Sequence, residues 1–185
     1  MREGVSTEIK LSSIKPIVSR TDLSGRIKYA NPYFVEVSGY SEKELLGSPH
    51  NIIRHPDMPK VIFKLMWQRL QKNQNILAVV KNRSKSGDYY WVTTLFEIKY
   101  NSYDKAPEGY LALRKAVPKG ARKIMEPLYK ELLVQESRGG MEASEAYLVD
   151  MLREKNMTYD EFMRETVEYN GLVAKFFHGM KKLFA

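Results

Sequence analysis

The chain of 185 residues contains no cysteine. This absence excludes disulfides, thiolate nucleophiles, cysteine-ligated zinc and iron–sulfur clusters. The sequence also lacks any run of about 18 or more apolar residues, so it predicts no membrane-spanning helix. The N-terminal stretch MREGVSTEIKLSSIKP has no apolar segment of the kind found in signal peptides. We therefore expect a cytoplasmic protein.

Acidic residues are too few to balance the basic ones, and the formal net charge is +8. The whole excess lies before residue 117, because residues 117–185 contain equal numbers of basic and acidic side chains. A basic region attracts an anionic partner, such as nucleic acid, an acidic protein or a phosphate-bearing cofactor. The aromatic residues near 89–91 resemble a nucleic-acid stacking platform only loosely, and no nucleic-acid-binding motif accompanies them. We expect no nucleic-acid partner.

The order of predicted elements indicates an α+β fold. Residues 16–34 contain two short strands around the turn DLSG, and a helix begins at Pro32 after an asparagine N-cap. SEKE (41–44) is a capping box that opens another short helix. Residues 59–73 have apolar side chains at helical spacing, with one buried face. Residues 76–100 break at SKSGD into a β-hairpin, and EGYLALRKA forms a further strand. We expect an antiparallel sheet with helices on one side.

From residue 117 onward the pattern is helical. Two amphipathic stretches are separated by SRGG, and TYDE forms a capping box before a last helical segment. The sequence therefore divides into an N-terminal segment (1–14), a sheet domain (15–116) and a helical extension (117–185). The apolar residues of the last segment predict packing on the sheet, packing among the helices, or a surface for a partner or dimer. They are Met163, Val167, Leu172, Val173, Phe176, Phe177, Met180, Leu183 and Phe184.

The densest group of ionisable residues is HNIIRHPDMP, residues 50–59. A metal site formed by His50, His55 and Asp57 would have no standard ligand spacing, and Arg54 between them disfavours a cation. No serine or cysteine elbow accompanies these residues, so we expect no enzyme. Two interpretations remain open from the residues alone. One is a structural loop in which Asp57 bonds Arg54 and caps the next helix, and the other is a ligand-binding loop.

Several stretches resemble the flavin-binding PAS domain of bacterial aerotaxis and energy-taxis receptors. They are YANPYFVEVSGYSEKELLGSPHNIIRHPDMP, VVKNRSKSGDYYWV and GYLALRKA, and MEPLYKEL continues the similarity beyond the sheet. ANPYFVEVSGYSEKELLG occurs broadly among PAS domains, whereas HNIIRHPDMP followed by VKNRSKSGDYYWV is much narrower. The resemblance implies a PAS fold, which is a five-stranded antiparallel sheet with flanking helices, followed here by a C-terminal helical extension.

In that family the PAS fold binds FAD non-covalently, and the redox state of the flavin is the signal. The resemblance implies that Arg54, His55 and Asp57 belong to the FAD-binding loop. The fork of the arginine suits the pyrophosphate, and His55 would bond a ribose or phosphate oxygen. The loop would then act as a cofactor clamp that its prolines stiffen.

The resemblance also carries four residues outside this loop. Asn82 would face the pocket and bond the polar edge of the flavin ring, and Asn31 matches a position linked to signalling. Trp67 and Trp91 match tryptophans in or near the pocket. From the residues alone, Asn82 could instead belong to a hairpin turn, and both tryptophans could be ordinary core residues.

The chain departs from the family at two positions. Ile76 stands where the family often has a tryptophan, and Tyr89 replaces a histidine. The first departure keeps open a PAS dimerisation or adaptor module with no cofactor. A haem-binding PAS sensor, with His50 or His55 as axial ligand, is a further alternative.

The expected partner follows from what the chain does not contain. A full receptor continues into membrane segments and a long helical signalling module, and neither is present. The chain therefore resembles the soluble sensor half of a two-part energy-taxis system, whose partner is a membrane-bound chemotaxis transducer. A homodimer stays open, and membrane contact would be indirect. Reduction of the flavin would re-pair Asn82 or a neighbour and shift the sheet, and the helices after residue 117 would carry that shift.

Overall fold

A computed structural model describes residues 6–168 and 171–184 of the chain. Five strands, a 3₁₀ helix and six α-helices follow one another along these residues. In chain order they are β1 (Ile17–Thr21), β2 (Ile27–Ala30), α1 (Pro32–Ser38), α2 (Glu42–Leu45), η1 (His50–Ile53, 3₁₀), α3 (Lys60–Gln71), β3 (Ile76–Arg83), β4 (Tyr89–Tyr100), β5 (Pro107–Ala116), α4 (Lys119–Glu154), α5 (Tyr159–Thr166) and α6 (Gly171–Phe184).

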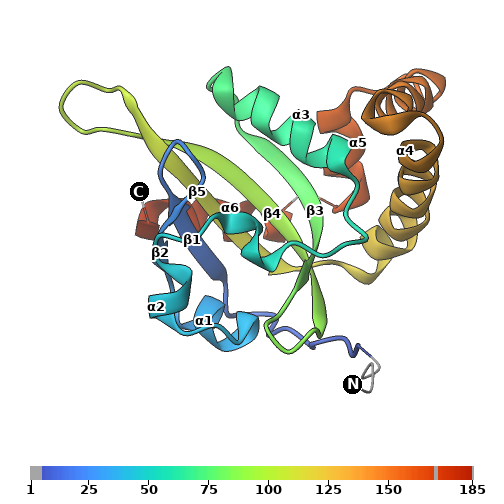
Figure 1. The fold of residues 1–185 in the computed structure, drawn as a ribbon. Helices are drawn as coiled ribbons and strands as arrows, with labels where there is room; N and C mark the ends of the chain where they lie inside the picture. The colour runs from blue at the N-terminus through green and yellow to red at the C-terminus, as the bar shows by residue number, and fades with distance from the viewer. Residues whose placement is uncertain (1–5, 169–170, 185) are drawn as a thin grey trace.

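The strands form one antiparallel sheet in the order β2-β1-β5-β4-β3. The predicted five-stranded antiparallel sheet is therefore confirmed. β2 and β3 lie at opposite edges, so the chain between them must cross the sheet, and α1, α2, η1 and α3 make that crossing (Figure 1). One face of the sheet is thus covered by α3 and η1.

Capping residues explain where the short helices begin. Asn31 accepts a hydrogen bond from the backbone N–H of Phe34 at 3.0 Å, and Pro32 occupies the first turn of α1. Ser41 and Thr158 form reciprocal capping boxes at α2 and α5, because each accepts from the N–H of the glutamate three residues on and that carboxylate accepts from the cap backbone. These predicted helix starts are confirmed.

The loop at residues 50–59 is less irregular than predicted. It begins with the single 3₁₀ turn η1, and Arg54 then forms an isolated antiparallel bridge with Asn82. The backbone of this loop is therefore held against the edge strand β3. Pro59 precedes α3 without a side-chain cap, and the carboxylate of Glu136 accepts the N–H of Val61 at 3.0 Å instead.

The helical extension packs onto the sheet domain. α4 changes direction at Gly139 and Gly140, whose backbone angles are not helical, so the predicted break at SRGG is confirmed. Figure 1 shows α4 and α5 beside α3. Two ion pairs join them, Lys64 to Glu145 at 2.5 Å and Arg69 to Asp160 at 2.9 Å.

The last helix, α6, lies against the face of the sheet opposite α3, where Lys115 of β5 sits 5.0 Å from the ring centroid of Phe176. Among the predicted apolar residues of the extension, Met163, Val167, Phe177 and Met180 are buried. The side chains of Leu172, Val173, Leu183 and Phe184 lie outside the described part of the structure. No helix among the described residues is long and apolar enough to cross a membrane.

Candidate ligand-binding cavity

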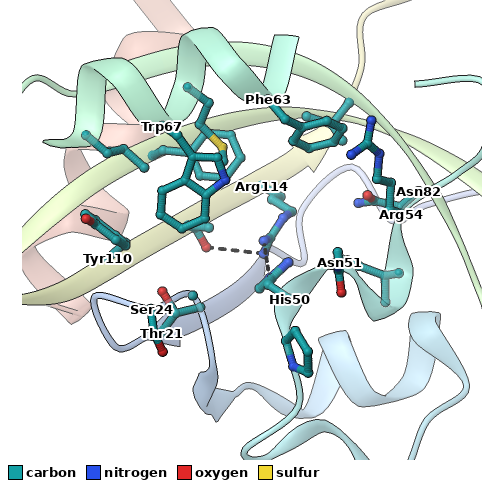
Figure 2. A pocket seen from close by; sticks show the side chains of 18 residues that line it. Thr21, Ser24, His50, Asn51, Arg54, Phe63, Trp67, Asn82, Tyr110 and Arg114 are labelled. Carbon is teal, nitrogen blue, oxygen red and sulfur yellow. Dashed lines mark hydrogen bonds between the residues drawn. The ribbon is translucent and has the colours of Figure 1, made fainter. Parts of the chain in front are cut away.

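A cavity of about 230 Å³ lies between α3 and the sheet. The turn between β1 and β2 and the segment from Pro49 to Arg54 close its sides (Figure 2). Its volume is slightly below the ~300–1,000 Å³ of common ligand pockets, which suits a planar ring better than an extended molecule. Most of its lining is apolar or aromatic. It comprises Thr21, Ser24, Gly25, Pro49, His50, Asn51, Ile53, Arg54, Phe63, Met66, Trp67, Leu70, Val80, Asn82, Phe96, Tyr110, Ala112 and Arg114.

One face of α3 supplies the aromatic wall of the cavity. Phe63, Met66, Trp67 and Leu70 recur at helical spacing and so point the same way. The ring of Trp67 meets Tyr110 edge-on, with the centroids 5.6 Å apart. Gly25, at φ +80°, lies so close to Trp67 that a Cβ there would stand 3.0 Å from the indole. Trp67 therefore forms part of the cavity wall.

Asn82 carries a polar group into this apolar wall from β3. Its side chain is only 4% exposed, and its Nδ2 finds no hydrogen-bond acceptor among the described residues. The hydroxyl of Tyr90, its cross-strand neighbour, also makes no well-formed hydrogen bond in the same part of the chain. Burial raises the pKa of this hydroxyl, and the Arg114 cation and the nearby Asn82 amide oppose that shift. An unsatisfied buried donor costs about 1–3 kcal/mol, and a ligand acceptor at this position would remove that cost.

Arg54 also lines the cavity. Its guanidinium stacks 4.2 Å from the ring centroid of Phe63 and donates from Nη2 to the carbonyl of Met58 at 3.1 Å. Burial lowers the pKa of Arg54, and the charge of Glu136 opposes that shift. The planar fork stays cationic and accessible to an anionic group.

His55 and Asp57 do not line the cavity, which corrects their predicted place beside the cofactor. The carboxylate of Asp57 pairs with the Nζ of Lys81 at 2.6 Å, and the ring of His55 meets Tyr89 edge-on at 5.8 Å. Lys81 precedes Asn82 on β3, so the two side chains point to opposite faces of the sheet. After Arg54 the chain therefore passes around the sheet edge. The alternative loop, with Asp57 bonding Arg54 and capping α3, is also wrong.

The pKa values of these two residues follow from the same contacts. Burial raises the pKa of the Asp57 carboxyl, but the hydrogen bond and charge of Lys81 outweigh it and leave that pKa lowered. Burial and then the Lys81 cation lower the pKa of His55. The Nδ1 of His55 accepts the backbone N–H of Asp57 at 3.0 Å. Both side chains thus hold the loop rather than reach the cavity.

Trp91 lies on the opposite face of the sheet, so its predicted place in or near the pocket is wrong. It pairs across the strands with Lys81, and its ring stacks on Tyr129 of α4 at 6.1 Å. The hydroxyl of Tyr129 donates to the carbonyl of Val79 at 2.6 Å. Trp91 is therefore part of the contact between the sheet and α4. It was misplaced because YYWV has no polar residue to mark which face each side chain takes.

Asn31 also lies outside the cavity. Its Oδ1 accepts from the N–H of Val18 at 2.9 Å and from that of Phe34, and its Nδ2 donates to the carbonyl of Pro16 at 2.9 Å. The side chain ties β1 to the start of α1, so it supports the fold rather than the cavity wall. Ile76 is buried at the start of β3 and does not line the cavity.

Two charged or titratable residues of the wall, Arg114 and His50, were not among the predicted FAD contacts. Arg114 of β5 donates from Nη2 to the Nε2 of His50 at 2.7 Å and from Nη1 to the hydroxyl of Ser19 at 3.0 Å. Burial and then the Arg114 cation lower the pKa of His50 to about 3, so its ring is neutral at physiological pH. The one available signal was the alternation of Tyr110 and Arg114 on β5, which places both on the same face.

The two histidines proposed as haem ligands are already engaged. The Nε2 of His50 accepts from a guanidinium, and the Nδ1 of His55 accepts from the loop backbone outside the cavity. An axial ligand needs a free ring nitrogen directed at the iron. The geometry disfavours haem. Within residues 6–168 and 171–184, no group of three histidine, aspartate or glutamate side chains could hold a metal ion.

Comparison with known proteins identifies this architecture. Residues 27–112 match the family described as the PAS fold. They form a PAS domain. The Escherichia coli (strain K12) aerotaxis receptor is 43% identical over 120 residues, which are 63% of this chain and 22% of the receptor. The PAS domain is thus related to that of an aerotaxis receptor, and the chain spans about a fifth of the length of that relative.

Solved structures agree on the fold of the PAS domain. The light-state structure of the blue-light photoreceptor Aureochrome1 LOV superposes with a TM-score of 0.53 at 19% identity, covering 60% of this chain and 88% of that one. A light-oxygen-voltage domain studied with a flavin analogue gives a TM-score of 0.51 at 19% identity, covering 63% and 86%. At this identity the likeness concerns the fold alone.

Proposed function

We propose that the chain is a redox sensor of the aerotaxis type, in which the PAS domain binds FAD in the cavity under α3. The observation that carries this proposal is the unsatisfied amide of Asn82, buried in a cavity whose lining is mostly apolar and aromatic. Such a cavity requires a flat apolar ligand with a hydrogen-bond acceptor on one edge. The relation to an aerotaxis receptor and the flavin named with one structural neighbour support a flavin as that ligand.

Different residues would hold different parts of such a cofactor. Trp67, Phe63 and Tyr110 supply flat surfaces for a ring, and Asn82 donates to its polar edge. The cavity holds about 230 Å³, so it accommodates the ring system and not the whole of FAD. Arg54 supplies a cationic fork for the diphosphate. A bound flavin would contribute the ability to accept and return electrons. His55 and Asp57 act indirectly, because they fix the loop that carries Arg54.

The helical extension gives this sensor a route to a partner. α3 supplies the cavity wall with one face and contacts α4 and α5 through Lys64 and Arg69 on another. A change in the cavity that moves α3 must therefore disturb α4 and α5 as well. We propose that these helices pass the change to a membrane-bound chemotaxis transducer, with the sensor in the cytoplasm as a monomer or homodimer. We propose no enzymatic turnover.

The visible absorption spectrum of the purified protein tests the cofactor. We expect the two visible bands of an oxidised flavin, and heat should release FAD that chromatography identifies. Arg54→Ala should lose the bands, whereas Trp91→Phe, altered on the opposite face, should keep them. A Soret band would favour haem. A protein that stays colourless after incubation with FAD would contradict the proposal and favour an adaptor module.

A further inference from the structure

The cavity wall contains a buried cation without a counter-ion. Arg114 is 2% exposed and lines the cavity from β5. Its guanidinium donates to the Nε2 of His50, the hydroxyl of Ser19 and, at 3.5 Å, the carbonyl of Ala112. No carboxylate of the described residues lies within ion-pair distance of it. All its partners are neutral acceptors.

The surroundings of Arg114 leave its charge uncompensated. His50 must be neutral to accept the guanidinium N–H, and the face of Phe34 lies 5.5 Å from the guanidinium carbon. Burial lowers the pKa of Arg114 to about 10, so the side chain remains cationic at neutral pH. Burying an ion without a partner costs free energy, and an anion bound in the cavity would reduce that cost.

Arg54, the other arginine that lines the cavity, differs from Arg114 because a carboxylate acts on it. The charge of Glu136 acts on it, and its side chain stacks on Phe63. Arg114 therefore offers the stronger attraction for a negative charge inside the cavity. Figure 2 shows the two guanidinium groups at separate positions in the wall, with Arg114 next to His50. The charge preference of the cavity should depend mainly on Arg114.

We propose that Arg114 forms an anion subsite, through which the cavity binds the anionic form of a planar ligand more tightly than the neutral form. This deepens the proposed function and rests on it where the ligand is a flavin. Two electrons and one proton added to an oxidised flavin leave one negative charge on the ring. The reductant supplies the electrons and water supplies the proton. Arg114 thus favours the reduced state by its differential affinity for the two forms.

A reductive titration of the FAD-loaded protein tests this role. Dithionite is the reductant, and reference dyes report the potential. Arg114→Gln should lower the preference for reduced over oxidised flavin at least tenfold, which is about 30 mV for a two-electron couple. Arg114→Lys should retain most of the preference. Lys115→Gln, the next residue on β5 with its side chain on the opposite face, is the matched control and should change nothing.

The outcomes separate the two proposals. An unchanged midpoint potential in an Arg114→Gln protein that still binds FAD would overturn the anion subsite and leave the flavin proposal intact. Lysine keeps the positive charge but not the shape of the guanidinium. If Arg114→Lys lowered the midpoint potential as much as Arg114→Gln does, the effect of Arg114 would not be one of charge. Circular dichroism of each variant establishes that it is folded.

A second measurement does not depend on FAD. Calorimetry of the wild-type protein with 2-naphthoate and with 2-naphthamide compares an anionic and a neutral ring of the same shape. We expect the carboxylate to bind at least tenfold more tightly. Arg114→Gln should lose that preference, whereas Arg54→Gln should retain most of it. Equal binding of the two probes to the wild type would overturn the subsite. A preference for naphthoate in a protein that takes up no FAD would sustain it and contradict the flavin proposal.

Discussion

The two faces of the sheet are built from alternate residues of the same strands and yet have opposite properties. On the cavity face, Asn82 and Tyr90 bury polar atoms that have no partner among the described residues. On the other face, Lys81 pairs with Asp57 and Trp91 stacks on Tyr129. The Nε1 of Trp91 and the hydroxyl of Thr93 on that other face are also without a partner among the described residues. The faces differ because a cavity lies beside Asn82, whereas helices pack against Trp91. Neighbouring residues of one strand therefore have different roles, because one faces the cavity and the next supports the packing on the other face.

The loop after η1 connects these two faces. Arg54 lines the cavity, and three residues later Asp57 reaches Lys81 on the opposite face. α3 makes a second connection, because its cavity-lining face and its ion pairs to α4 and α5 belong to one rigid helix. A change in the cavity can therefore reach the helical extension through either element.

The largest expected effect is a difference in stability between the alanine variants of the two tryptophans. Trp91→Ala removes a ring that is 4% exposed and packed on α4, so we expect a loss of about 3–5 kcal/mol in the free energy of unfolding. Trp67→Ala enlarges a cavity that already exists, and we expect a smaller loss together with weaker FAD binding. Urea unfolding and FAD titration of both variants measure this. Equal destabilisation would contradict the contrast between the faces.

The next largest effect is the contribution of His50 to the pH dependence of the free energy of unfolding. Its pKa is about 3 in the folded protein and 6.5 unperturbed, so between these values the unfolded chain binds a proton that the folded protein does not. The free energy of unfolding should therefore fall as pH falls from 6.5 toward 3, by up to about 1.4 kcal/mol per pH unit. Urea unfolding at several pH values in this window measures the slope.

His50→Gln keeps a hydrogen-bond acceptor without the titratable ring, and its slope should be shallower than that of the wild type. His178→Gln, at an exposed position, is the control and should keep the wild-type slope. If the slopes of His50→Gln and the wild type were equal, His50 would not be a neutral acceptor for Arg114.

A smaller effect should come from the ion pair at the sheet edge. Asp57→Asn leaves the Lys81 side chain, which is 11% exposed, without its carboxylate. Water replaces part of the interaction because the Asp57 side chain is 60% exposed, so we expect a loss of about 1 kcal/mol at neutral pH. The pKa of Asp57 is lowered in the folded state, so this contribution is present above the unperturbed value of 3.8 and disappears as pH falls below it.

The comparison variant for this pair is Lys85→Gln, which breaks the more exposed pair with Glu44 but keeps the carboxylate of the α2 capping box, and it should destabilise less. Unfolding in urea at neutral pH and at a pH well below 3.8, where the Asp57 carboxyl is protonated in the folded protein too, distinguishes the two variants. A loss from Asp57→Asn that persisted at the lower pH would assign its effect to something other than the ion pair.

The sequence predicted the parts of the fold that local chemistry determines. Asn31-Pro32, Ser41 with Glu44, and the turn at SKSGD each specify an element boundary through contacts within a few residues. These predictions depend on periodicity and capping, which a single sequence contains.

The predictions that failed depend on contacts between distant residues. Trp91 lies in a strand whose two faces are both buried, so alternation gave no sign of its orientation. The partner of Asp57 is 24 residues away on β3, and His50 and Arg114 are separated by 64 residues. Only the strand register brings these pairs together, and neither composition nor spacing specifies that register.

FAD titration of the ligand-free protein tests the central claim most directly, with a variant on each face. Asn82→Leu removes the unsatisfied amide from the cavity, and Thr93→Val removes a buried hydroxyl without a partner among the described residues from the opposite face. We predict that the wild type and Thr93→Val bind FAD with equal affinity and that Asn82→Leu binds at least tenfold more weakly. Equal binding by Asn82→Leu, or no binding by the wild type, would contradict the account.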